Sequence, residues 1–362
     1  MFLAWKEIKH AEAKFALIMA VVTLVSYLVY FLTSLAYGLA SSYTNGVTKW
    51  EADQIVLTAD ANDNVMMSLM GESDYQAITV TGEKAKLGLF PAVIKQKTPL
   101  TSLDTREEVY IFGIEEDSFI APKEIPPAGL SDNQVVVDAS LKDLGYELNM
   151  QIVVPGIEPE LVFEIVGFTE KATYQTAPIV YANLATWKQI RYQAIPVEVF
   201  SAVVIQGSVT SLVDSSVTAG ELVSYEIQDF INSLPGYTAQ VATFSLMIGF
   251  LIFIVAFVLA IFIYVLTIQK SSMFGVMKAQ GISNAYIGRS VVAQTFIITA
   301  IGVAIGLALT LISGYFLAGT VPFAINLLFY IAITAGFFVF AVFGGLFSVR
   351  AVLKIDPLRA IG

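Results

Sequence analysis

The stretch FSLMIGFLIFIVAFVLAIFIYVLTIQKSSMFGVMKAQGISNAYIGR, residues 244–289, decides the fold of this chain. Residues 244–268 contain no Asp, Glu, Lys or Arg. A hydrocarbon core about 30 Å thick is crossed by about 20 apolar residues in a helix, so this part is predicted to span a membrane. Residues 269–289 mix charged, polar and apolar side chains and are predicted to leave the lipid and pack against another surface.

Three further apolar stretches, at residues 15–38, 290–317 and 327–347, are long enough to cross a bilayer. The chain is 56% hydrophobic with a mean hydropathy of +0.72. Soluble domains contain roughly 45–50% apolar residues. We therefore predict an α-helical membrane protein with four transmembrane helices and a large mixed α/β domain, residues 39–241, between the first two.

Charge is divided sharply along the chain. Residues 39–241 hold 27 of the 30 acids but 11 of the 20 Lys and Arg, whereas the rest holds 9 Lys and Arg against 3 acids. Positive residues in short segments beside transmembrane helices stay in the cytoplasm. This pattern predicts a multi-pass protein of the plasma membrane with both termini cytoplasmic and residues 39–241 extracellular.

The extracellular segment is predicted to be one mixed α/β domain or two lobes divided near Gly129. Helices are expected at residues 140–144, before Gly145, and at 219–234, before Pro235. β-Branched residues and alternation predict strands at 54–58, 77–81, 108–114, 134–137, 151–154, 162–166 and 202–205.

The two ends of the chain are predicted to be cytoplasmic. Residues 1–14 form an amphipathic elbow on the inner membrane surface, and residues 348–362 form a basic tail. A cleaved secretory signal is the alternative for the first apolar stretch. Signal cores of roughly 7–15 residues are shorter than this stretch, so a retained helix is favoured.

Residues 269–289 are predicted to form a cytosolic coupling loop around a short amphipathic helix. A glycine and a Ser-Asn pair then end this helix and start the next one. Such a helix suits the groove of a partner protein. Its predicted shared face consists of Met273, Val276, Met277 and Gln280. The residues assigned to coupling are Met273, Phe274, Gly275, Val276, Met277, Lys278 and Gly281.

The run MFGVMKAQGIS, residues 273–283, resembles the corresponding loop of FtsX/MacB-type ABC transporter permeases. The order of one helix, a large external domain, three helices and a basic end with Pro357 is similar to that family's topology. The opening MFLAWKEIK, residues 1–9, resembles the DevC/HrtB subgroup, whose HrtB members export haem. This resemblance implies a homodimeric permease, working with two copies of a separate ABC ATPase that binds ATP, and an amphipathic substrate, with haem as the first candidate.

The chain itself offers little chemistry for catalysis. The pattern G-x-x-x-x-G-K-[ST] does not occur, so ATP is expected on a partner. Cysteine is absent and the one histidine, His10, is predicted to be cytosolic, which excludes a Ser-His-Asp triad or a histidine-based zinc site outside. The acidity excludes nucleic acid as a partner. We predict a non-catalytic membrane subunit with no intrinsic cofactor or metal.

Substrate contacts are predicted in the outer half of the membrane. The first two spans lack Asp, Glu, Lys, Arg and His, which favours an amphipathic or apolar substrate that enters from the lipid over an ion. A planar apolar molecule suits the aromatic and thioether side chains of Tyr27, Tyr30, Phe31 and Met247. The alternative for these residues is an interfacial belt or helix packing.

Tyr174 and Tyr237 lie in the extracellular segment and just before the second span. Their placement resembles that of tyrosines implicated in haem-efflux permeases, so they are candidate ligands for haem iron. The iron ligand must be Tyr, Met or a carboxylate, since Cys is absent and His10 is predicted on the cytoplasmic side of the membrane. A structural tyrosine with a hydrogen-bonded hydroxyl is the alternative for each.

Two other functions fit the same architecture. One is a mechanical transmitter that transports nothing and controls an extracellular partner, as FtsX is thought to do; the other is a lipid or peptide exporter. In the third span, the spacing of Gly302 and Gly306 predicts close helix packing, either within the chain or at a dimer seam.

Overall fold

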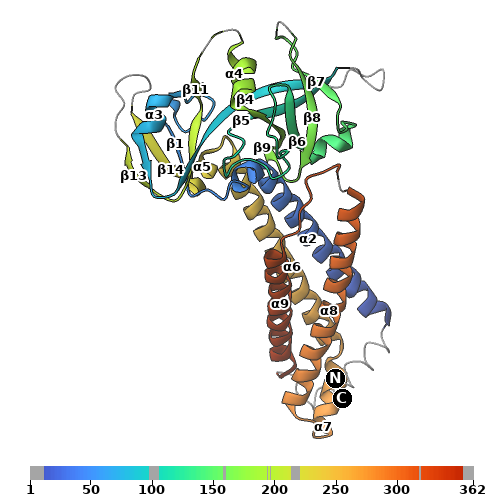
Figure 1. The fold of residues 1–362 in the computed structure, drawn as a ribbon. Helices are drawn as coiled ribbons and strands as arrows, with labels where there is room; N and C mark the ends of the chain where they lie inside the picture. The colour runs from blue at the N-terminus through green and yellow to red at the C-terminus, as the bar shows by residue number, and fades with distance from the viewer. Residues whose placement is uncertain are drawn as a thin grey trace. The chain divides into compact units, whose positions relative to one another are not determined.

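The computed structural model describes residues 12–97, 106–157, 160–193, 195, 197–212, 221–317 and 319–353 (Figure 1). Most of the predicted elbow and the end of the predicted tail lie outside these residues. The chain divides into two compact units. The membrane unit is Met1–Gly38 with Val241–Gly362, and the outer unit is Leu39–Gln240.

Long apolar helices build the membrane unit. Its helices are α2 (Glu12–Thr48), α6 (Tyr237–Gln269), α7 (Ser271–Ala279), α8 (Asn284–Leu317) and α9 (Leu327–Leu353). All except α7 are long and apolar enough to cross a membrane. The predicted fold class is confirmed: the described residues contain four such helices, with a large mixed α/β unit between the first and the second.

Helix α2 continues ten residues beyond the predicted span, which ended at residue 38. It continues because its last turns belong to the core of the outer unit, where Val47 and the following Trp50 are buried. A Cβ on Gly46 would lie 2.3 Å from Cδ1 of Ile179, so this turn needs glycine to approach the sheet. Helix α2 therefore contributes residues to both units.

The outer unit combines short helices with many strands. Its helices are α3 (Glu72–Ala77), α4 (Leu184–Tyr192), α5 (Ile227–Ser233) and the 3₁₀ turns η1 (Ala59–Ala61) and η2 (Ala139–Leu144). Its strands are β1 (Gln54–Thr58), β2 (Met70–Gly71), β3 (Ile78–Val80), β4 (Glu83–Gln96), β5 (Arg106–Ile114), β6 (Gln134–Asp138), β7 (Gln151–Val153), β8 (Val162–Thr169), β9 (Thr173–Tyr174), β10 (Ala177–Asn183), β11 (Val199–Phe200), β12 (Ala202–Gln206), β13 (Val209–Leu212) and β14 (Leu222–Glu226).

Most of these strands join one sheet in the order β14-β1-β12-β4-β5-β10-β6-β8-β7, with β9 paired to β10. The end of the long strand β4, at Lys95 and Gln96, also pairs with β7. This second pairing closes β4, β5, β10, β6, β8 and β7 into a ring, while β12, β1 and β14 extend from β4 as an open sheet.

Three clusters of buried apolar side chains fill the outer unit. The one inside the strand ring includes Trp187 of α4, which lies flat on two strands. Cβ atoms on Gly88 and Gly113 would lie 2.3 and 2.4 Å from this side chain, so the glycines leave room for the helix to pack on the sheet.

Two predictions about the outer unit are wrong. No boundary near Gly129 divides it, because β5 before that residue pairs in parallel with β10 after it. The helix predicted at residues 219–234 is wrong in its first part, where Leu222–Glu226 is a strand because β14 pairs along the whole length of β1; the helix α5 begins at Ile227 and ends at Ser233. Tertiary pairing overrides local helix propensity at this position.

Candidate functional site

The predicted coupling segment forms a helix–turn–helix in the membrane unit (Figure 1). One residue, Lys270, separates the end of α6 from the start of α7. Gly281 ends α7 with φ of +84°, a conformation that costs glycine little, and its N–H donates to the carbonyl of Lys278 at 3.0 Å. Ser283 Oγ then accepts the N–H of Tyr286 at 3.3 Å and caps α8.

The two faces of α7 have different surroundings. Phe274 is 2% exposed and packs with Ile287 and Val291 of α8. Met273 and Val276 are 38% and 42% exposed. Phe274 therefore holds α7 against α8, whereas Met273 and Val276 present an apolar surface outward.

The other residues assigned to coupling lie between these extremes. Gly275 is buried, Met277 and Lys278 are half-buried, and Gly281 is exposed. Met277 packs with Ile282 around the Phe274 cluster. The seven residues thus divide into a group that shapes the joint with α8 and a group available to another molecule.

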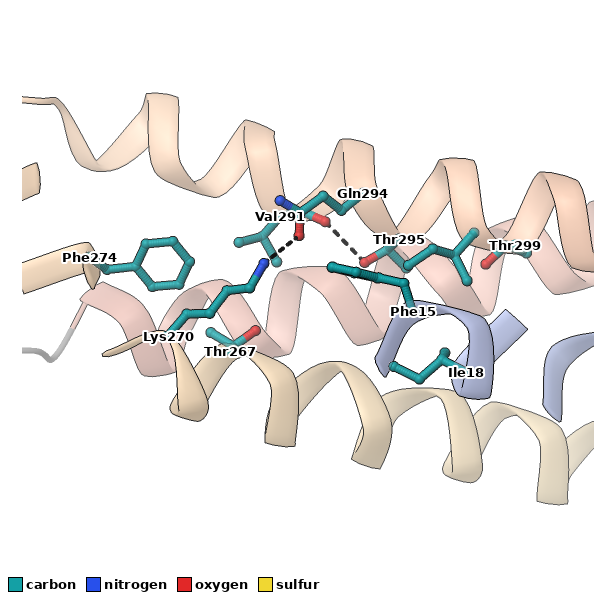
Figure 2. A pocket seen from close by; sticks show the side chains of 10 residues that line it. Phe15, Ile18, Thr267, Lys270, Phe274, Val291, Gln294, Thr295 and Thr299 are labelled. Carbon is teal, nitrogen blue, oxygen red and sulfur yellow. Dashed lines mark hydrogen bonds between the residues drawn. The ribbon is translucent and has the colours of Figure 1, made fainter. Parts of the chain in front are cut away.

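A small cavity lined by apolar and polar side chains lies beside this joint, between α2, α6, α7 and α8 (Figure 2). Its volume of about 20 Å³ has room for about one water molecule. Lys270 Nζ donates to Gln294 Oε1 at 3.4 Å and lies 4.9 Å from the centre of the Phe15 ring. Thr299 Oγ1 is buried without a partner among the described residues. Sequence reasoning missed this cavity because its polar residues come from separate helices and form no local pattern.

The aromatic residues predicted to contact substrate in the membrane lie between packed helices. Tyr30 is 0% exposed, its hydroxyl hydrogen-bonds to Thr334 Oγ1 at 2.5 Å, and its ring centre is 5.1 Å from that of Tyr330. The Tyr27 hydroxyl and Ser313 Oγ are 3.1 Å apart. In this structure both tyrosines join α2 to the helices beside it.

Phe31 and Met247 complete the predicted membrane set, and both are half-buried. The ring centre of Phe31 lies 5.6 Å from that of Tyr27 and 5.9 Å from that of Phe323. Met247 lies in the outer half of α6. Phe31 thus belongs to a packed aromatic row along α2.

Tyr174 is buried in the core of the outer unit, with 3% of its surface exposed. Its ring centre lies 4.9 Å from that of Tyr110 and 5.7 Å from that of Phe112, both in edge-on geometry. Burial raises the pKa of the Tyr174 hydroxyl above its ordinary value. The phenol therefore stays protonated in this conformation, and iron coordination would require its exposure.

Tyr237, at the start of α6, packs on the same core as Tyr174. Its ring centre lies 5.9 Å from that of Tyr43, whose hydroxyl donates to the Pro235 carbonyl at 2.5 Å. The structure therefore brings the two predicted tyrosines to one core and adds Tyr43 and Tyr110 to them. We call these four residues the outer tyrosine cluster. Sequence reasoning missed the two additions because they come from α2 and β5, far apart in the chain.

The turn after Tyr174 has an unusual backbone. Gln175 and Thr176 connect β9 to β10 with φ of +48° and +71°. Tight hairpin turns of this kind prefer Asn-Gly, and a β-branched residue at positive φ is strained. The N–H groups of Gln175 and Thr176 donate to the α2 carbonyls of Tyr43 and Ser42 at 3.0 and 3.3 Å, which holds the turn in place.

Comparisons with known proteins find similarity to membrane permeases. Residues 216–357 match the model of the FtsX-like permease C-terminal region. A protein of Staphylococcus epidermidis (strain ATCC 12228) named "Putative hemin transport system permease protein HrtB" is 27% identical over 373 residues, and one of the same name from Staphylococcus haemolyticus is 26% identical over 372. Both alignments cover 100% of this chain and 99% of the relative.

Among solved structures, the periplasmic region of MacB from Actinobacillus actinomycetemcomitans is similar at a TM-score of 0.33 and 9% identity, covering 53% of this chain and 95% of that one. The family model includes all of α6, α7, α8 and α9. This protein is therefore a multi-pass membrane protein whose residues 216–357 are similar to the C-terminal region of FtsX-like permeases.

Proposed function

We propose that this chain is the permease subunit of an ABC exporter that extrudes an amphipathic molecule, hemin first among the candidates, from the membrane. The full-length similarity to proteins named as hemin transport permeases supports the substrate class. The observation that carries the proposal is the open apolar face of α7 beside its buried anchor Phe274, because a transporter without its own ATP site needs such a contact.

The ATPase is a separate subunit in this proposal. The chain has no phosphate-binding loop motif, so it contributes no recognisable ATP site. Two copies of the chain would pair in the membrane and bind two copies of the ATPase through Met273 and Val276. Both termini would be cytoplasmic, on the same side as α7, with the outer unit extracellular.

The outer tyrosine cluster is the proposed substrate contact outside the membrane. A tyrosine phenolate is an established ligand of haem iron. Tyr237 is half-buried and already near the surface, whereas Tyr174 must be uncovered by movement of the β9–β10 turn. Within the membrane unit, Phe31 and Met247 remain separate proposed contacts for an apolar substrate.

An optical titration of the purified full-length chain with hemin tests the substrate. We expect saturable binding, with a Soret shift, that weakens about tenfold in Tyr174→Phe and Tyr237→Phe, which lose one iron ligand each. Tyr192→Phe is the matched control, because its buried hydroxyl in the outer unit has no hydrogen-bond partner among the described residues. Binding that does not saturate, or that ignores both substitutions, would remove hemin from the proposal and direct the search to lipids or peptides.

One observation favours a second function, the transmission of force to an extracellular partner without transport. Met67, Leu69 and Ile195 are 71%, 44% and 65% exposed on the outer unit. They come from segments joined by Arg191, whose Nη2 donates to the Met66 carbonyl at 2.9 Å. Stimulation of the partner ATPase by hemin supports the exporter, whereas an ATPase indifferent to hemin and stimulated by an outside protein supports the transmitter.

A further inference from the structure

We propose that α8, rather than α6, carries the movement of α7 through the membrane unit to α2. The proposal rests on the function proposed above, in which α7 receives movement from the ATPase. The two helices that flank α7 in the chain are both connected to it covalently. They differ in how they pack, and this difference selects the route.

The first joint binds α7 to α8. Phe274 of α7, Ile287 and Val291 of α8 form a buried cluster in which each residue is at most 5% exposed. Met277 and Ile282 close the cluster from α7 and the turn. Removal of a buried phenylalanine from such a cluster leaves a cavity that neighbours fill incompletely. Helices α7 and α8 are therefore expected to move as one body.

The second joint binds α8 to α2 through two glycines. A Cβ on Gly302 would lie 2.6 Å from Val22 Cγ1, and a Cβ on Gly306 would lie 2.1 Å from Ser26 Oγ and 2.8 Å from the Tyr27 backbone nitrogen. Contacts under 3.0 Å show that the helices approach more closely than any side chain there allows. The glycine spacing thus serves packing within the chain.

Hydrogen bonds along the same face reinforce this joint. Ser26 Oγ lies 3.3 Å from the Gly302 carbonyl and Thr310 Oγ1 lies 3.4 Å from the Tyr27 carbonyl, and each hydroxyl shares its hydrogen with a closer carbonyl of its own helix. The Tyr27 hydroxyl reaches Ser313 Oγ further along α8. The contact therefore extends over about three turns of α8, from Gly302 to Ser313, and over less than two turns of α2, from Val22 to Tyr27.

Helix α6 packs through fewer buried side chains: Val255 joins the buried cluster that includes Phe15 and Val22 of α2, with Leu251, Ile252 and Phe262 packed against that cluster. Among its described side chains, Val255 and Thr267 are the two that are buried, and a Cβ on Gly249 would meet nothing within 4 Å. Lys270, at the junction with α7, reaches across to Gln294 of α8. Even the end of α6 is thus tied to α8, which supports α8 as the element that moves with α7.

Helix α2 connects this route to the outer unit, because its last turns lie in that unit's core. Val47 is 0% exposed in that core. Just after the helix, Lys49 Nζ donates to the Glu170 carbonyl at 3.0 Å and to the Thr169 hydroxyl. Helix α2 is thus the element of this route whose residues belong to both units.

A size series at the glycines tests the second joint in the reconstituted permease–ATPase complex. We expect Gly306→Ala and Gly306→Leu to reduce hemin export per ATP hydrolysed in order of size, by about tenfold for Leu, while hydrolysis continues. Gly249→Leu is the matched control with open space around it. Loss of hydrolysis and export in equal proportion at Gly306 would contradict a role in transmission.

A rescue pair distinguishes the loss of this helix contact from general misfolding of the chain. Gly302→Ala should impair export because its Cβ meets Val22, and Val22→Gly should restore export when combined with it by removing the clashing atoms. A structural defect unrelated to this contact would not be rescued. Absence of rescue in a pair that folds and hydrolyses ATP normally would overturn the role of the joint.

Spin-label distances test the first joint without requiring transport. Because the chain has no cysteine, the pairs Ser272→Cys with Tyr286→Cys, and Ser272→Cys with Ile261→Cys, report on α7–α8 and α7–α6 alone. We expect ATP trapping in the complex to leave the first distance unchanged and to shift the second. A change confined to the first pair would overturn the route, and no response in either would overturn both the coupling assignment and the route.

Discussion

Tyr174 illustrates how a candidate ligand can also be a core residue. Its ring is enclosed by Tyr110 and Phe112, and burial raises the pKa of its hydroxyl. The backbone of the neighbouring turn is strained, since Gln175 and Thr176 both have positive φ, and this strain favours movement of the turn away from Tyr174. Strained backbone of this kind persists where the surroundings hold it in place. Substrate binding at Tyr174 would then require this turn to break its hydrogen bonds to α2.

The strain at Thr176 leads to a prediction about stability. Thr176→Gly should raise the free energy of unfolding by about 1 kcal/mol, because glycine adopts φ of +71° without the clash that a β-branched residue suffers. The side chain is exposed, so no packing is lost. Chemical unfolding of the detergent-purified chain measures the change.

The matched control is Thr210→Gly, at an exposed threonine of β13 that is not among the residues with positive φ. This control should lose roughly 0.5–1 kcal/mol, as glycine does within strands, and in addition the hydrogen bond that Thr210 Oγ1 donates to the Thr79 carbonyl at 3.1 Å. Equal destabilisation by both substitutions would show that the turn after Tyr174 is relaxed.

At the scale of elements, hydroxyl pairs join the membrane helices where hydrophobic packing alone gives little preference. Ser34 Oγ of α2 and the Tyr330 hydroxyl of α9 are 2.6 Å apart, and Tyr30 bonds to Thr334 one turn away. Lipid tails are as apolar as leucine side chains, so hydrogen bonds and close packing supply the specificity of helix association. These pairs determine which faces of α2 and α9 meet.

A double-mutant cycle measures the strength of this pairing. Ser34→Ala, Tyr330→Phe and the double variant should give a coupling free energy of about 0.6 kcal/mol, the average for interhelical hydrogen bonds in a membrane. Thermal unfolding in a fixed detergent supplies the three values. Tyr315→Phe, at a residue that is 81% exposed, should leave stability unchanged. A coupling energy of zero would mean that water or lipid satisfies both hydroxyls equally well.

For the whole molecule, the asymmetry of charge predicts orientation. The exposed Ser131 of the outer unit should face outward and Ser283, between α7 and α8, should face the cytoplasm. In intact cells, a membrane-impermeant maleimide should label Ser131→Cys and not Ser283→Cys, and lysis should expose the second. The native chain, which lacks cysteine, is the unlabelled control. Labelling of Ser283→Cys alone would invert the topology.

The architecture of this protein could be predicted from sequence because hydropathy and charge act over long segments. Residues 15–38 and 244–268 were recognisable as spans without any knowledge of their neighbours. The packing of side chains was less accessible. Tyr30 was predicted to line a substrate path, and the structure places it between helices with its hydroxyl bonded to Thr334.

The same limit applies to the outer unit. Strand β14 resembles a helix in composition and becomes a strand because β1 lies beside it, a fact that no window of sequence contains. The gathering of Tyr43, Tyr110, Tyr174 and Tyr237 on one core likewise depends on tertiary contacts between four distant segments. Local sequence patterns predict which residues have the right chemistry for a site, and tertiary contacts determine which of them lie close together.

The position of β1 in the sheet also determines when this sheet can form during synthesis of the chain. β1 lies between β14 and β12, so Ile55 pairs with Val204 and Tyr225 although roughly 150 residues separate it from either. At a synthesis rate of about 5–20 residues per second, β1 waits about 10–30 s for its partners after it emerges. During that interval β1 is an apolar strand with two unpaired edges. Folding of the unit that contains β1 is therefore expected to depend on a chaperone that shields these edges until β12 and β14 have been synthesised.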